Sequence, residues 1–184
     1  MPEKNINSTT TLPTVLRPTP DESGMTVPQL LEHRINTLFE QIPLVAELGE
    51  AFARAGHDLY LVGGSVRDAL MGRLGHDLDF TTDARPDDTE AILRQHTHAT
   101  WDIGRAFGTI GAQIDDWVVE VTTYRADAYH PDSRKPEIVY GETLEDDLIR
   151  RDFTVNAMAL HAATRTFSDP YAGLTDICLL YTSL

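Results

Sequence analysis

The sequence of 184 residues has little cysteine, no long apolar run and few basic side chains. Its one cysteine, Cys178, has no partner for an internal disulfide bond, which is typical of proteins in the reducing cytoplasm. No stretch of about eighteen apolar residues occurs, and the N-terminus lacks the apolar segment of a signal peptide. We therefore expect a cytoplasmic protein without a membrane partner.

The chain has 15 basic and 29 acidic residues, which gives a net charge of −14. A field of this sign disfavours broad contact with RNA phosphates, although a local basic path remains compatible with it. A solvated acidic surface is the simplest interpretation. The seven histidines are scattered without the spacing of metal ligands, so no histidine-based metal cluster is expected.

The stretch from residue 59 to residue 82 carries the strongest pattern. A short apolar, β-prone run ends at two glycines, a helix is predicted from Ser65 to Met71, and a second strand follows. That strand holds Asp77 and Asp79, whose side chains share one face because side chains alternate along a strand. Two carboxylates about 7 Å apart repel each other unless a cation lies between them. Mg²⁺ suits such a pair, because it binds one or two carboxylates together with substrate phosphates.

The two glycines and the predicted helix favour an anion beside that metal. Gly63 and Gly64 allow the backbone to approach a ligand closely. A helix that starts at Ser65 would direct free N–H groups and its positive dipole end at an anion. Arg67, in the first turn of that helix, adds a guanidinium for phosphate oxygens. The stretch as a whole predicts a site for a metal and a triphosphate.

Glu120 lies in the alternating strand pattern WVVEVTTY, with apolar residues on both sides of it. A carboxylate in this position is either exposed to solvent or paired with a cation, because an isolated buried charge is costly. A solvent-exposed strand glutamate is one interpretation. The other is a third carboxylate for Asp77 and Asp79, which a two-metal phosphoryl-transfer site can use.

The chain between and beyond these residues alternates helices with short strands. Arg105 lies between two of the strands, either near the site or in a plain hairpin connection. An arginine pair, Arg150-Arg151, falls in a segment that reads as one helix; a solvated face is the ordinary interpretation of such a pair. The first predicted helix begins at Thr26 and keeps the helical spacing of apolar residues to Phe39. The other predicted helices are 43–55, 86–96 and 144–161, the predicted strands are 98–103, 108–114, 117–124 and 165–168, and 125–141 is predicted as a polar loop.

Four landmarks occur in order along the chain: GGSVRD with DLDF, EVTTYR, RRDFTVNAMA and DPYAGLTD. Together they resemble the polymerase-beta-type nucleotidyltransferases. More narrowly they resemble the head domain of the bacterial class II tRNA nucleotidyltransferase and poly(A) polymerase family. The resemblance covers about residues 30–177. It implies an α/β (α+β) head, a small mixed sheet with helices, preceded by two helices.

The resemblance also implies a reaction. It is the template-independent, Mg²⁺-dependent transfer of a nucleotide from CTP or ATP to the 3′ end of tRNA, with release of pyrophosphate. A poly(A) polymerase and a catalytically incomplete nucleotide-binding fragment are the alternatives. Arg151 would contact the phosphates, and Asp152 and Asn156 would orient the sugar or the loop. The implied catalytic residues are Asp77, Asp79 and Glu120, with the metal at Asp77 and Asp79, and the implied nucleotide-binding residues are Gly63, Gly64, Arg67, Arg151, Asp152 and Asn156.

The same comparison divides the chain into four parts. We expect a disordered leader at 1–24, N-terminal helices at 25–56, the nucleotidyltransferase head at 57–168 and the start of a neck at 169–184. The base-selecting E-D-x-x-R-x-x-R block of the family does not follow Ile177. The stretch from Cys178 is therefore interpreted as a truncated or foreign end, outside the fold.

Overall fold

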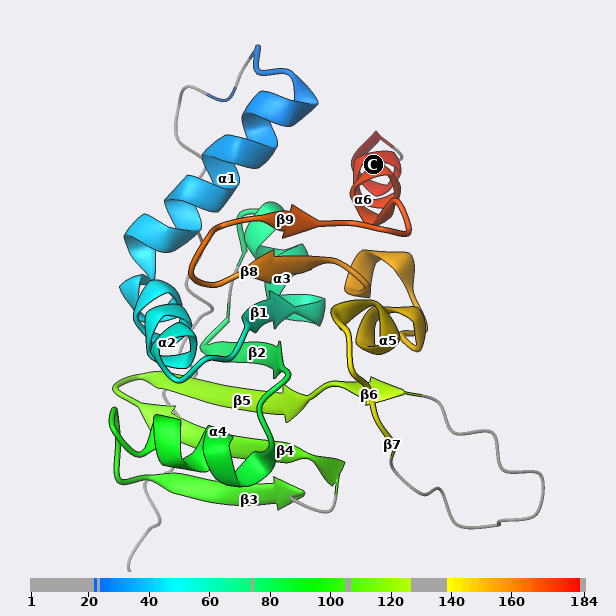
Figure 1. Ribbon diagram of the computed structural model, residues 1–184. Coiled ribbons are helices and arrows are strands. Elements are labelled where there is room, and N and C mark those ends of the chain that lie inside the picture. The colour runs from blue at the N-terminus through cyan, green and yellow to red at the C-terminus, as the bar shows by residue number, and fades with distance from the viewer. Residues whose placement is uncertain (1–21, 23, 74, 105–106, 127–138, 183–184) are drawn as a thin grey trace, which may run out of the picture.

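The computed structural model describes residues 22, 24–73, 75–104, 107–126 and 139–182 (Figure 1). The leader expected at residues 1–24 lies almost entirely outside this part, and Arg105 lies outside it as well. None of the helices in the described part has the length and apolar character that a membrane crossing requires.

Two helices precede the sheet, as predicted. Helix α1 (Val27–Gln41) begins after Thr26, whose backbone N–H donates a 2.9 Å hydrogen bond to the side chain of Gln29. Helix α2 (Pro43–Arg54) ends in a Schellman motif at Gly56, where φ is +85° and the N–H of His57 donates to the carbonyl of Phe52. Glycine suits this position because it adopts a positive φ without strain.

The strands form a seven-stranded sheet and a separate two-stranded ladder. Figure 1 shows the order β9, β8, β1, β2, β5, β4, β3 from top to bottom. Within this sheet β2 and β5 run parallel, while the other neighbouring strands are antiparallel. The strands are β1 (Leu59–Val62), β2 (Asp77–Thr82), β3 (Thr100–Gly104), β4 (Thr109–Ile114), β5 (Trp117–Thr123), β8 (Ala159–His161) and β9 (Phe167–Ser168), with β6 (Arg125–Ala126) and β7 (Val139–Tyr140) in the ladder.

One face of the sheet forms the main core. Leu61, Leu78, Phe80 and Val119 point to it and are buried against helices α1 to α4, which include α3 (Gly63–Leu70) and α4 (Pro86–Leu93). Because side chains alternate along a strand, the residues between them point to the opposite face. That second face is covered only in part, by α5 (Leu144–Ile149), which packs on β1 and β8. The sheet therefore presents an open area beside α5.

The helix predicted for residues 144–161 is wrong. The structure has α5, then a 3₁₀ turn η2 (Thr154–Asn156), then strand β8, which pairs with β1. The apolar run at residues 157–160 fits a buried strand as well as a helix, and pairing with β1 decides between them. Helix α3 also begins two residues before the predicted start, at Gly63.

The last helix, α6 (Gly173–Thr182), extends through residues that the sequence placed outside the fold. Asp169 accepts hydrogen bonds from the backbone N–H groups of Gly173 at 2.7 Å and Leu174 at 2.9 Å, which stabilises the start of this helix. Thr154 donates a hydrogen bond to Asp176, so α6 is tied to the 3₁₀ turn.

Candidate active site

Three carboxylates lie on the open face of the sheet. Parallel pairing of β2 with β5 places Asp79 directly opposite Glu120, and Asp77 one step away opposite Val118. Burial raises the pKa of Asp79 above its usual range, and the charge of Asp77 raises it further, against the opposing effects of Arg151 and Ser65. Burial raises the pKa of Glu120 as well, and Asp79 and Asp77 add to this effect. The three carboxylates therefore act on one another as neighbouring negative charges.

The glycine turn between β1 and α3 lies next to these carboxylates. Gly63 has a φ of +64°, which favours glycine, and a Cβ atom there would lie 3.1 Å from Nη1 of Arg151. Ser65 fixes the start of α3 to β2, because its hydroxyl accepts from the N–H of Asp79 at 3.0 Å and donates to the carbonyl of Asp77 at 3.3 Å. One strand and one helix start thus hold the carboxylates and the glycines together.

Arginines gather on the side of α5, around the carboxylate of Asp147. The Asp147 side chain is fully buried and accepts from Nη2 of Arg150 at 2.7 Å and from Nη2 of Arg151 at 2.8 Å. It also accepts from the backbone N–H of Arg125 at 3.3 Å. Burial on its own would raise the pKa of Asp147, but the charges and hydrogen bonds of the two arginines hold it below its usual range. Asp147 therefore stays ionised and orients the arginine side chains.

These arginines retain unused hydrogen-bonding capacity. The Nε atoms of Arg125 and Arg151 are buried and have no hydrogen-bond partner in the described part of the chain. Burial, with the nearby charge of Arg150, lowers the pKa of Arg125 below its usual range. The guanidinium groups of Arg150 and Arg151 share the one carboxylate of Asp147, and the guanidinium of Arg125 donates to Thr109 Oγ1 at 3.0 Å instead, so positive charge is in excess among these side chains. An anion with several oxygens, such as a phosphate chain, would balance both the charge and the free donors.

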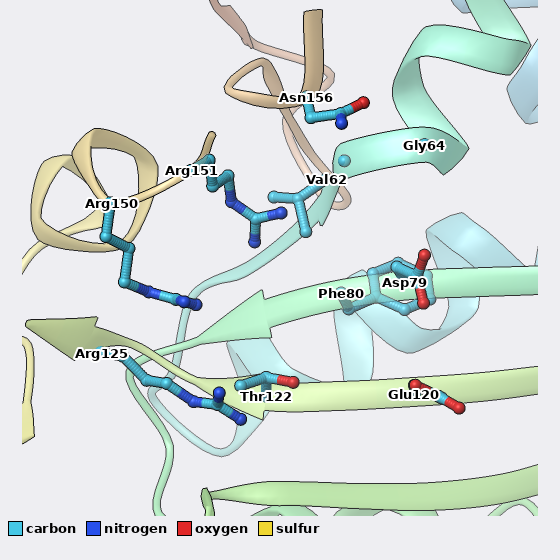
Figure 2. A pocket seen from close by; sticks show the side chains of 11 residues that line it. Val62, Gly64, Asp79, Phe80, Glu120, Thr122, Arg125, Arg150, Arg151 and Asn156 are labelled. Atoms are coloured by element: carbon cyan, nitrogen blue, oxygen red, sulfur yellow. The ribbon is translucent and has the colours of Figure 1, made fainter. Parts of the chain in front are cut away.

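The glycines, carboxylates and arginines enclose one pocket of about 280 Å³. Figure 2 shows Arg125, Arg150 and Arg151 on one side of it, with Asp79 and Glu120 on the other. Its lining residues are Val62, Gly63, Gly64, Asp79, Phe80, Glu120, Thr122, Arg125, Arg150, Arg151 and Asn156. The pocket thus joins the two halves of the site that the sequence predicts, one for a cation and one for an anion.

Not every predicted residue lies in this pocket. Asp77 lies at the exposed start of β2, and Asp152 is exposed on the turn after α5. Arg67 is in the second half of α3, and the prediction of a first-turn position is wrong because the helix starts at Gly63. Its guanidinium donates to Asn156 Oδ1 at 2.9 Å and to Asp68 at 2.8 Å. Arg67 therefore orients Asn156, which does line the pocket.

The sequence did not single out Asp147 and Thr122, and it gave Arg125 and Arg150 no specific role. For Asp147 a signal exists: Arg150 and Arg151 follow it at i+3 and i+4, the spacing of ion pairs on a helix. The burial that gives this carboxylate its importance depends on the packing of α5 onto the sheet, which the spacing does not reveal.

The carboxylates suit Mg²⁺. Their oxygens are hard donors, and Asp77 and Asp79 lie close enough for Asp77 to raise the pKa of Asp79. Within the described ranges no three His, Cys, Asp or Glu side chains are already arranged around one point as a complete metal cage. Mg²⁺ binds one or two carboxylates, with water and substrate phosphates as its remaining ligands.

We expect Mg²⁺ to raise the melting temperature at pH 7 and to have no effect below about pH 4, where carboxyl groups are protonated. The raised pKa values of Asp79 and Glu120 mean that the folded chain holds more protons than the unfolded chain just above that pH. Without metal, their contribution to the free energy of unfolding should therefore decrease as pH rises through this window. Thermal melts across pH, with and without Mg²⁺, test this. A Mg²⁺-induced shift that persists in Asp79→Asn would contradict the assignment.

Comparison with known proteins places this site in a family. Residues 59–179 match the family model described as Poly A polymerase head domain. The CCA-adding enzyme of Staphylococcus aureus (strain MRSA252) is 41% identical over 143 residues, which cover 77% of this chain and 34% of that protein. The chain thus spans about a third of the length of the curated relatives it matches.

Solved structures agree with this match. The CCA-adding enzyme of Bacillus stearothermophilus in complex with CTP has a TM-score of 0.63 at 34% identity, covering 74% of this chain and 31% of that one. A tRNA nucleotidyltransferase complexed with a primer tRNA and an incoming ATP analog has a TM-score of 0.58 at 32% identity, covering 71% and 36%. The mixed sheet is that of the polymerase-beta-type nucleotidyltransferase head, which confirms the predicted fold. The chain belongs to the Poly A polymerase head domain family.

Proposed function

We propose that this chain is the catalytic head of an enzyme that transfers a nucleotide from CTP or ATP to the 3′ end of tRNA and releases pyrophosphate. The observation that carries the proposal is the pocket itself, in which Asp79 and Glu120 face a group of arginines with unused donors. The similar CCA-adding enzymes, one of them complexed with CTP, support this choice of substrates.

The arginines and the glycine turn would hold the triphosphate. Arg151 and Arg150 are kept in place by Asp147 and offer their remaining N–H groups to phosphate oxygens. At Gly63 and Gly64 the backbone can approach the phosphates without obstruction by a side chain. Arg67 would act through Asn156, and a direct role for Asp152 in nucleotide binding remains a prediction from sequence.

The carboxylates would serve the reacting centre. Asp77 and Asp79 would hold Mg²⁺, which when bound neutralises phosphate charge and lowers the pKa of the RNA 3′-hydroxyl. Glu120, opposite Asp79, lies where it can assist in orienting that hydroxyl. Because the attacking and leaving oxygens are in line, the pyrophosphate would leave toward the arginines and the 3′-hydroxyl would approach from the other side of the carboxylates.

The division of the chain forms part of the proposal. Residues 57–168 would form the catalytic head and residues from 169 onward would begin a neck, with the reaction taking place in the cytoplasm. The family model is described as Poly A polymerase head domain, while the similar curated proteins are CCA-adding enzymes, so a poly(A) polymerase is the second candidate function.

Incorporation of labelled CTP and ATP into tRNA that ends at the discriminator base tests this function. We expect Mg²⁺-dependent incorporation of CTP, then ATP, by a protein that carries this head, and Mg²⁺-dependent binding of both nucleotides by the 184-residue chain. Repeated addition of ATP alone would identify a poly(A) polymerase. Absence of both incorporation and Mg²⁺-dependent nucleotide binding would contradict the proposal.

A further inference from the structure

An exposed tryptophan lies on the same face of the sheet as the carboxylates. Strand pairing aligns Trp101 of β3 with Gly111 of β4, Gly111 with Glu120 of β5, and Glu120 with Asp79 of β2. Residues paired in this way point to the same side of a sheet. Trp101 therefore occupies the row of Glu120 and Asp79, two strands away from Glu120.

In that row only a glycine lies between Trp101 and Glu120. Adjacent strands are about 4.8 Å apart, so the backbones of Trp101 and Glu120 are about 10 Å apart. The residue between them, Gly111, has no side chain of its own and is buried, so neighbouring side chains cover it. Trp101 is 39% exposed although it is a large aromatic residue, and in the described part of the chain no aromatic ring or cation stacks on it. We call the surface from Glu120 across Gly111 to Trp101 the shelf; the exposed indole lies at its outer edge.

The shelf lies on the side from which an acceptor would approach. Gly63, Gly64 and Arg151 are on the β1 side of the carboxylates, and Figure 2 shows Gly64 and Arg151 there, with Glu120 beyond Asp79. Strand β3 is at the opposite edge of the sheet. In-line displacement, on which this inference rests through the proposed function, brings the 3′-hydroxyl in from the side away from the leaving group.

The side chains along this surface suit a nucleobase rather than a phosphate as ligand. Strands β3 and β4 contain no lysine or arginine, so they offer no cation to an RNA backbone. A tryptophan ring binds any base by stacking, and this attraction does not depend on counterion release. We propose that Trp101 is the stacking platform for the 3′-terminal base of the RNA acceptor, positioning its 3′-hydroxyl at Glu120 and the carboxylate pair.

The test uses an RNA acceptor-stem hairpin whose 3′-terminal base is 2-aminopurine, a fluorophore that is quenched by stacking. Binding to the chain should quench it. Trp101→Ala should remove the quenching and raise the Kd for the hairpin roughly 5- to 100-fold, while Trp101→Phe should retain most of both. The Kd for Mg²⁺·ATP should not change, and the dependence of log Kd on log salt should keep its slope.

Tyr171 supplies the matched control, because it is an aromatic residue of similar exposure, 37%, on the turn before α6 rather than on the open face. Tyr171→Ala should leave hairpin binding and quenching unchanged. If Trp101→Ala binds the hairpin as the parent does, or the parent binds Mg²⁺·ATP without quenching the probe, the platform is wrong and the proposed function stands. If the parent binds neither Mg²⁺·ATP nor the hairpin, the proposed function fails and the platform fails with it.

Discussion

Changing Asp77 and Asp79 together to alanine is expected to lower nucleotidyl transfer by about 10³-fold or more, because removal of the metal's ligands forfeits several kcal/mol of transition-state stabilisation. Asp77 is the first residue of β2 and Asp79 the third, and Asp79 lines the pocket. The measurement is Mg²⁺-dependent incorporation of labelled CTP or ATP into tRNA by a protein that carries this head.

The same substitution should not unfold the chain. Burial and the charge of Asp77 raise the pKa of Asp79, so at neutral pH these charges oppose folding, and their removal relieves that opposition. We expect an unchanged or higher melting temperature without metal. Asp87 and Asp88, in the first turn of α4, supply a control pair of adjacent carboxylates, whose change to asparagine should leave transfer unaffected. Turnover that survives in the Asp77/Asp79 variant would refute the metal assignment.

Asp147→Ala should have the largest effect on stability, a loss of about 3–5 kcal/mol in the free energy of unfolding. The carboxylate is fully buried and holds Arg150 and Arg151, so its removal leaves two partly buried cations without their partner. Nucleotide binding should weaken at the same time, because the arginines lose their orientation. Denaturant unfolding and nucleotide titration measure the two effects separately.

The pH dependence distinguishes this effect from simple loss of packing. The pKa of Asp147 is held below its usual range, so its contribution to stability is present above about pH 4 and is lost as pH falls through the folded value. The variant should lack this acid-dependent step. Asp152→Ala, at an exposed carboxylate on the turn after α5, should leave the free energy of unfolding unchanged. Equal destabilisation by both substitutions would show that Asp147 has no special role.

The carboxylate pair was predictable because it depends on local geometry alone. Asp77 and Asp79 share a face in any strand, and Gly63 can adopt a positive φ that other residues avoid. The position of Glu120 opposite Asp79 could not be predicted from local geometry, because tertiary packing, and not the sequence of either strand, sets the register of β2 on β5. The resemblance to a family supplied that information before the structure showed the pairing.

The errors in prediction share a physical origin. Residues 144–161 alternate between helical and strand-like patterns, and pairing with β1 decides the matter at Ala159–His161. The expected position of Arg67 is two residues too close to the start of its helix, and its guanidinium donates to Asn156. Asp147 was overlooked because the burial of a helix face depends on what covers it. In each case a contact distant in sequence determines what the local pattern leaves open.

The parallel pairing of β2 with β5 also affects how the active site forms during folding. Strands β2 and β5 are separated by α4, β3 and β4, so Asp79 and Glu120 meet only when that whole intervening segment has folded back on itself. Closing so long a segment costs conformational entropy before any contact compensates for it, and such pairings form slowly. The complete set of three carboxylates is therefore absent from partly folded chains and comes together only with the native topology, whereas the Asp77–Asp79 pair needs β2 alone.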